Sequence, residues 1–114
     1  MTDAPGASLP RQFLRPLLTI ALSTGASYGY ELTDRLHQLG LQMIDTPAIY
    51  RMLRTMEHER VVESWWEASE SGPRRRVYEL TSSGFGAARR HAQDLSEVRD
   101  LLDEAVGIVM DLKG

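Results

Sequence analysis

Residues 46–80 read TPAIYRMLRTMEHERVVESWWEASESGPRRRVYEL, and this stretch opens with a strong helix signal. Thr46 supplies a capping hydroxyl, and Pro47 follows at the first helical position, where proline is well tolerated. Ile49, Leu53 and Met56 recur at helical spacing and predict the buried edge of this helix. The side chains predicted to point away from that edge are Ala48, Arg51, Arg54, Thr55 and His58.

The second half of the same stretch predicts a β-hairpin. Residues 61–67 are rich in β-branched and aromatic side chains, and residues 74–80 alternate in the manner of a returning strand. Residues 68–73 between them contain Ser, Gly and Pro and predict a turn. Because two strands alone are marginally stable in water, this hairpin must pack on the helices.

Two more helices are predicted upstream. Residues 10–22 carry one apolar stripe at helical spacing, with Pro16 in the first turn or at a kink. Ser27 is the predicted N-cap of a second helix, and Gly40 suits the left-handed position after its end. Three helices followed by a strand, a basic turn and a strand make a winged helix-turn-helix unit, whose third helix enters the DNA major groove.

The C-terminal part predicts one long amphipathic helix from residues 81–84 to about Leu112. Its apolar residues follow the spacing of a coiled-coil seam. The seam comprises Leu95, Val98, Leu102, Ala105, Val109 and Leu112, and it is widened by Leu101, Val106 and Ile108. At about 25 cal/mol per Å² of apolar area, leaving them exposed costs several kcal/mol, so we expect a second copy of the chain to bury them. The alternative is a helix that folds back on its own domain.

Composition bounds the class of protein. The chain has 114 residues, 42% hydrophobic and 25% charged, which is typical of one globular domain with or without an appended helix. The absence of Cys excludes disulfides, thiolate zinc sites and Cys nucleophiles, and it fits a reducing cytoplasm. Residues 1–10 do not resemble a signal peptide, and no apolar run approaches the ~18 residues of a membrane span. We therefore expect a cytoplasmic protein.

The net charge of −3 is unevenly distributed. Residues 1–90 hold 11 Arg against 10 acidic residues, whereas residues 91–114 hold two basic and six acidic residues. The acidity therefore belongs to the C-terminal segment, where it fits a solvated helix face. Any DNA-binding surface must be local and built from arginine.

The third helix carries side chains suited to DNA. Arg51 and Arg54 share one of its faces, and guanidinium groups pair with guanine edges or clamp phosphates. Thr46 and the helix N-terminus offer a hydroxyl and backbone N–H groups to a phosphate. For Tyr50, a contact with the DNA backbone and packing under the helix remain open alternatives.

The predicted wing holds the strongest charge cluster, Arg74, Arg75 and Arg76. At a hairpin tip these arginines are placed to reach phosphates or a minor groove. Strand alternation prevents all three from pointing the same way, so one of them is available to pair with Glu67 or Glu70.

Trp65 and Trp66 should lie on opposite faces of the first wing strand because side chains alternate. One of them suits the core. The other is available to pack against the C-terminal helix or to line a ligand cavity. We expect both to fill the core or an interface, and a ligand site is the alternative.

No catalytic constellation is found. His37, His58 and His91 fall on three different predicted helices without an acidic partner at ligand spacing. The glycines are scattered and form no phosphate loop. Neither an enzyme nor a metal or cofactor site is expected.

Three blocks of this sequence resemble the PadR family of winged helix-turn-helix transcriptional regulators, over about residues 12–112. The segment from Leu17-Leu18 through Tyr28-Gly29-Tyr30-Glu31-Leu32 is similar to the family's "LL…GYEL". Residues 46–53, TPAIYRML, resemble its recognition helix, and residues 72–84, GPRRRVYELTSSG, resemble its wing and "YxLTxxG" exit. The single C-terminal helix resembles the short-tailed subgroup.

The resemblance implies a homodimer that binds a palindromic operator and is released by a small molecule or another signal. Two positions depart from the family. Arg60 stands where Gly is usual, and Leu95 stands where multidrug-binding relatives stack planar ligands on a Trp. The DNA-binding candidates are Ser27 at the start of the second helix, Thr46, Ala48, Tyr50, Arg51 and Arg54 on the third, and Arg74, Arg75 and Arg76 in the wing.

The predicted fold is mainly α with a two-stranded β-hairpin wing and a long C-terminal dimerisation helix. Residues 1–9 are expected to be a flexible N-terminus, 10–81 the winged helix-turn-helix domain and 82–114 the dimerisation helix. The predicted function is transcriptional repression by a homodimer on double-stranded DNA. The alternatives are a protein-interaction adaptor and a ligand sensor without DNA binding. An adaptor need not join the arginines of the third helix and the wing in one continuous surface.

Overall fold

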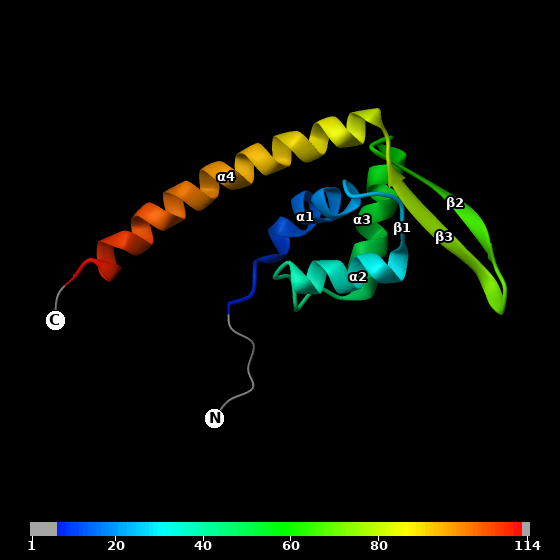
Figure 1. The fold of residues 1–114 in the computed structure, drawn as a ribbon, viewed down its shortest axis with the longest axis horizontal. Helices are drawn as coiled ribbons and strands as arrows, with labels where there is room; N and C mark the ends of the chain where they lie inside the picture. Colours follow the sequence, from blue (N-terminus) through cyan, green and yellow to red (C-terminus); the bar gives the residue numbers. More distant parts are fainter. Residues whose placement is uncertain (1–6, 113–114) are drawn as a thin grey trace, which may run out of the picture.

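The computed structural model describes residues 7–112 and arranges them as a small helical domain with a projecting hairpin and a long terminal helix (Figure 1). The elements are, in order, η1 (Arg11–Phe13), α1 (Leu14–Leu22), β1 (Ser27–Tyr28), α2 (Gly29–Gln38), α3 (Thr46–His58), β2 (Val62–Ser69), β3 (Gly72–Leu80) and α4 (Ser82–Met110). The mainly α fold with a hairpin wing and a long C-terminal helix is confirmed. None of the helices within residues 7–112 is long and apolar enough to cross a membrane.

The core lies where α1, α2 and α3 meet the base of the sheet. The predicted apolar edge of α3 is buried as expected, with Ile49, Leu53 and Met56 fully inaccessible to solvent. A fully buried aliphatic side chain contributes about 1.5–3 kcal/mol relative to an exposed one. The other large side chains sealed in this core are Leu18, Leu22, Leu32, Leu36, Leu41 and Val62. This packing fixes α3 beneath the wing.

The sheet has three antiparallel strands, in the order β1-β3-β2, rather than the two predicted. The additional strand β1 pairs Ser27 with Tyr78 and Tyr28 with Val77. Ser27 is therefore a strand residue, and its predicted role as the N-cap of α2 is wrong. The N-cap is Tyr28, whose backbone N–H donates to the Glu31 carboxylate at 2.9 Å. This bond satisfies one of the free donors at the start of α2.

The wing hairpin is longer than predicted. Strands β2 and β3 extend to Ser69 and from Gly72, so only residues 70–71 separate them, in place of the predicted turn over 68–73. The ladder shifts register between Glu67 and Ser69, as at a β-bulge. The distal half of the hairpin projects beyond the helical core, so most of its side chains are exposed (Figure 1).

The start of α3 also differs in detail. Its N-cap is Asp45, and Thr46 is already the first helical residue, so the prediction that Thr46 caps this helix is wrong by one position. Pro47 still lies within the first turn, where a missing backbone N–H costs nothing. Ala48 was predicted to point outward, but it is buried at 3% exposure because the helix packs closely at its N-terminal end.

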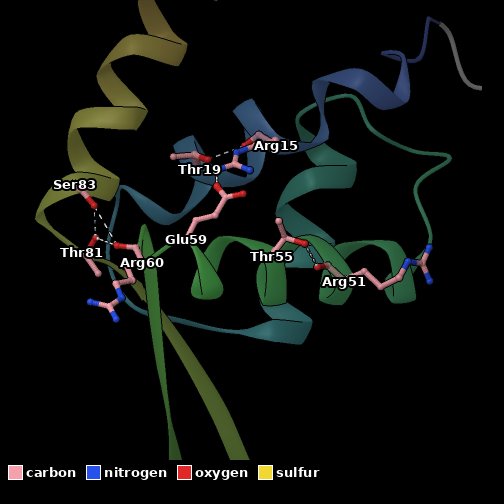
Figure 2. Close-up of polar contacts among 8 residues, drawn as sticks. All are labelled: Arg15, Thr19, Arg51, Thr55, Glu59, Arg60, Thr81 and Ser83. Atoms are coloured by element: carbon pink, nitrogen blue, oxygen red, sulfur yellow. Dashed lines mark hydrogen bonds and ion pairs between the residues drawn. The ribbon is translucent and has the colours of Figure 1, made fainter.

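A tight junction joins α3, β2 and the start of α4 (Figure 2). Arg60, where the PadR family usually has Gly, has a positive φ of 64°. Its carbonyl accepts hydrogen bonds from the hydroxyls of Thr81 at 2.8 Å and Ser83 at 3.1 Å. The Thr81 hydroxyl also accepts from the backbone N–H of Gly84 at 3.1 Å and thereby caps α4. The left-handed residue thus aims one carbonyl at the N-terminus of the next helix.

The two halves of α4 have different surroundings. The first half packs on α1, and its Ala87 and Ala88 are buried. The second half extends beyond the helical core (Figure 1), and Leu102, Ile108 and Val109 are 58–69% exposed. The described chain does not itself cover these apolar residues. A helix folded back on its own domain, which was the alternative, would have covered them along its whole length.

At the N-terminal end, Ser8 and Leu9 are hydrogen-bonded to the carbonyl of Gly40, at 3.3 and 2.8 Å. Residues 1–6 of the predicted flexible segment, and residues 113–114, lie outside the described residues. The described end of that segment, at Ser8 and Leu9, is therefore hydrogen-bonded to the backbone just after α2.

Candidate nucleic-acid interface

The outer face of α3 presents arginine to solvent. Arg51 and Arg54 are both exposed, one turn apart, as their spacing predicts. Figure 2 shows the Arg51 side chain extending away from the Glu59–Arg15 ion pair, which joins α3 to α1. That pair lowers the pKa of the Glu59 carboxyl, because Arg15 donates a hydrogen bond to it. The Arg51 face therefore lies apart from the contacts that hold α3 in the domain.

A groove of about 530 Å³ lies between α3, the start of α2 and the wing. Four arginines line it, Arg54 from α3 and Arg74, Arg75 and Arg76 from β3. Its aromatic lining residues are Tyr28, Tyr30, Tyr50, Trp66 and Tyr78. Helix and wing arginines, separate in the sequence, thus share one concave surface.

The wing arginines do not all face the same way, as strand alternation predicts. The guanidinium carbons of Arg74 and Arg76 lie 5.7 and 5.0 Å from the ring centroid of Trp66. The guanidinium carbon of Arg75 lies 5.4 Å from the ring centroid of Tyr28. Such cation–π contacts hold a guanidinium over an aromatic face and reduce its freedom.

Arg76 also bonds to the base of the wing and to α3. Its Nε donates to the Ser64 hydroxyl at 3.0 Å, and its Nη2 lies 3.5 Å from Glu57 Oε2. Ser64 in turn donates to the same Glu57 oxygen at 2.7 Å. The acidic partner of a wing arginine is therefore Glu57, rather than Glu67 or Glu70 as the sequence suggested.

Tyr28 connects the start of α2 to the outer part of the wing. Its hydroxyl donates to Glu67 at 2.9 Å, and this carboxylate raises the pKa of Tyr28 above its usual value. The ring stacks on Tyr30 with centroids 5.6 Å apart and planes 8° from parallel. Sequence reasoning placed no functional role on Tyr28, Tyr30 or Glu57. The only available signal was their proximity to predicted DNA-binding residues.

Tyr50 lies against α2 at a glycine. A Cβ at Gly29 would fall 2.4 Å from the Tyr50 hydroxyl oxygen, so the absence of a side chain lets the ring pass close to the α2 backbone. Tyr50 is half-buried and also lines the groove. Tyr50 therefore packs against α2, and because it also lines the groove, a contact with the DNA backbone stays a prediction.

Two sequence candidates do not reach the surface. Ser27 is 2% exposed and its hydroxyl donates to the Gly25 carbonyl, while Ala48 is 3% exposed. The expectation that one tryptophan is a core residue is also wrong, because Trp65 and Trp66 are 38% and 52% exposed. Both belong to the projecting hairpin, and Trp66 faces the groove.

A second, apolar groove of about 410 Å³ lies between α1 and α4. Leu9, Phe13 and Leu17 form one wall. Leu95, Val98, Leu102 and Val106 of α4 form the other. Three residues of the predicted coiled-coil seam, Leu95, Val98 and Leu102, therefore line this groove. The seam residue Ala105 does not line it, whereas the neighbouring Val106 does. Within residues 7–112, no group of three or more His, Cys, Asp or Glu is placed to hold a metal ion.

A helix-turn-helix formed by α2 and α3, followed by a hairpin that shares a groove with α3, defines a winged helix-turn-helix protein. The model of the transcriptional regulator PadR-like family matches residues 17–90, more than half of the chain, and the chain belongs to this family. No curated protein sequence matches the chain.

Solved structures share this fold. A PadR-like transcriptional regulator from Bacillus cereus is 26% identical, with a TM-score of 0.75, over 84% of this chain and 93% of its own. A PadR family regulator from Clostridium difficile shares the fold at 22% identity and a TM-score of 0.72, over 83% and 99% of the two chains. A protein from Streptococcus mutans shares it at 21% identity and a TM-score of 0.78, over 96% and 99%.

Proposed function

We propose that this PadR-family regulator is a repressor that binds a palindromic operator as a homodimer. Helix α3 enters the major groove, where Arg51 reads a base edge and Arg54 binds a base or a phosphate. The wing contacts phosphates through Arg74, Arg75 and Arg76. Thr46, exposed at the start of α3, and Tyr50, at the rim of the groove, complete the contacts.

One observation carries the proposal: Arg54 of α3 and the three wing arginines line a single groove, and Arg51 is exposed one turn before Arg54 on the same helix. A duplex needs this arrangement, because a helix in the major groove brings the adjacent hairpin onto the flanking backbone. An adaptor that uses the same fold to bind proteins has no such requirement. The continuity of the basic surface therefore favours DNA over a protein partner.

The homodimer is proposed from the apolar stripe of α4. Residues 10–81 then form the DNA-binding domain and residues 82–114 the dimerisation segment. The predicted interface comprises Leu95, Val98, Leu101, Leu102, Ala105, Val109 and Leu112. The apolar groove between α1 and α4 exposes Leu95, Val98 and Leu102 for contact with the α4 helix of a second copy. Two copies joined in this way would present two α3 helices to successive turns of DNA, ~34 Å apart.

Release of the DNA by a small molecule or another signal is proposed on the family relationship alone. Leu95, which is half-buried in the α1–α4 groove, offers no aromatic surface to a planar ligand. The aromatic side chain that lines this groove is Phe13, on the opposite wall.

Fluorescence anisotropy tests the DNA-binding proposal. The purified protein is titrated with labelled DNA from upstream of its own gene and with random DNA, each over a series of salt concentrations. Selective binding with one dimer per site is expected, with an affinity that falls as salt rises. Equal weak binding to both duplexes would direct the search to other genomic sites. No binding at low salt would contradict the proposal and favour the adaptor.

A further inference from the structure

Glu57 is the acidic side chain among the groove's lining residues, beside four arginines. It comes from the last turn of α3, between the recognition face of that helix and the base of the wing. A carboxylate in this position repels a DNA phosphate that enters the groove. Its presence therefore needs a reason other than DNA contact.

The geometry supplies that reason. Glu57 Oε2 accepts from Ser64 at 2.7 Å and lies 3.5 Å from Arg76 Nη2, while Arg76 Nε donates to Ser64 at 3.0 Å. The guanidinium of Arg76 is thus held by Ser64, Glu57 and the face of Trp66. Without DNA, the positive charge of Arg76 is already partnered within the chain.

We propose that Glu57 is an internal counter-ion that competes with DNA phosphate for Arg76 and so limits the electrostatic affinity of the wing. This inference rests on the proposed DNA-binding function. The side chains of both partners are 35% exposed, and ion pairs with that much solvent access are weak enough to be exchanged. A phosphate that takes the Nη2 donor of Arg76 must displace the Glu57 carboxylate, and the displaced charge remains beside it.

The test is Glu57→Gln, which removes the charge but keeps an amide oxygen that can accept from Ser64. Because phosphate contacts are independent of sequence, binding is measured on a random-sequence duplex. The variant is expected to bind about three- to tenfold more tightly at low salt, with a salt slope steeper by about one. A role confined to holding the wing in place would instead weaken binding.

Glu59→Gln is the matched control. It removes the same charge two residues further along the chain, but Glu59 is paired with Arg15 of α1, away from the groove lining (Figure 2). This variant is expected to bind random DNA nearly as the wild type does. An equal gain in both variants would overturn the proposal, because it would reflect net charge alone.

A double-mutant cycle with Arg76→Ala tests whether Glu57 acts through Arg76. In the Arg76→Ala background only the direct repulsion between Glu57 and phosphate remains, so Glu57→Gln is expected to raise the affinity less than it does in the wild type. A gain as large without Arg76 as with it, or weaker binding by a Glu57→Gln variant with an unchanged melting curve, would overturn the counter-ion role. If the wild type binds random DNA and the Glu57→Gln variant binds it with the same affinity, this inference is overturned but the proposed function is not. A wild type that does not bind random DNA at low salt would overturn the proposed function as well.

Discussion

Arg60 is a single residue on which the junction between α3 and the wing depends. Among the described residues it is the non-glycine residue with a positive φ, 64°, and an L-residue pays about 1–2 kcal/mol for that conformation. Arg60 holds the junction through its backbone, because its carbonyl accepts hydrogen bonds from the Thr81 and Ser83 hydroxyls. The side chain itself is exposed.

Arg60→Gly should therefore stabilise the protein. Glycine adopts a positive φ without strain and leaves both hydrogen bonds to the carbonyl in place. We expect a gain of about 1 kcal/mol, or roughly 4 °C in Tm, measured by thermal unfolding. Glu59→Gly, one residue earlier at φ −83°, should lower Tm instead. An unchanged or lower Tm for Arg60→Gly would contradict this account.

Gly84 closes the same junction from the side of α4. A Cβ at this position would lie 2.1 Å from the Val61 carbonyl oxygen, a backbone atom that cannot swing aside. Gly84→Ala should cost about 2 kcal/mol or more in the free energy of unfolding, since one segment must shift. Chemical denaturation measures this loss. Gly86→Ala is the control, because the nearest atom to its Cβ is Arg90 Nη1 at 3.6 Å. That substitution should be neutral or stabilising, and equal losses at both positions would refute the steric explanation.

At the scale of elements, α3 and the wing should contribute to DNA binding in different ways. Arg51→Ala removes a base-reading side chain and should cost about 1–3 kcal/mol on the operator while changing random-DNA binding much less. Arg74→Ala removes a phosphate contact and should weaken binding to both DNAs and flatten the salt slope by about one. Anisotropy titrations of both variants on both DNAs measure the difference. Equal losses on specific and random DNA for Arg51→Ala would refute its base-reading role.

The elements that the sequence predicted well are those with a local signal. Helix α3 has the Thr46-Pro47 start and a repeating apolar edge, and the hairpin has strand-forming residues on both sides of a segment with Ser, Gly and Pro, although the turn itself is confined to residues 70–71. Strand β1 has neither. It is two residues long, and it exists because Ser27 and Tyr28 pair with residues some fifty positions later. Such a strand is set by tertiary packing and has no pattern of its own.

The parts of the candidate site that sequence reasoning missed have the same origin. Arg51, Arg54 and the wing arginines were found from charge and spacing alone. The bond from Ser64 to Glu57 depends on how β2 leaves α3 through the left-handed Arg60, which composition does not reveal. The tryptophans were misplaced because a strand pattern gives alternation but not the distance by which the hairpin projects beyond the core. Ser27 and Ala48 were placed at the surface for a similar reason, since a cap or a face shifts with one residue of register.

At the scale of the whole molecule, the charge is separated along the longest dimension. The described chain spans 61 × 38 × 20 Å, with the wing and the C-terminal end of α4 at opposite ends (Figure 1). The arginines of the groove belong to the wing end, and the segment from residue 91 onward holds six acidic residues against two basic ones. A net charge of −3 is therefore compatible with DNA binding, because the acidic segment lies far from the proposed DNA-binding groove.

The same separation makes α4 the place to test assembly. Leu102 is 58% exposed and lines the α1–α4 groove, so Leu102→Glu places a charge in the proposed interface without disturbing the domain core. We expect this variant to sediment as a monomer with an almost unchanged circular dichroism spectrum. It should also lose most of its operator affinity, because a single half-site remains bound. Gln93→Glu is the control: it adds the same charge at an exposed position nine residues earlier, on the opposite face of the helix. It should remain dimeric. If Leu102→Glu sediments as the wild type does, α4 is not the dimerisation element, and its apolar stripe must serve another partner.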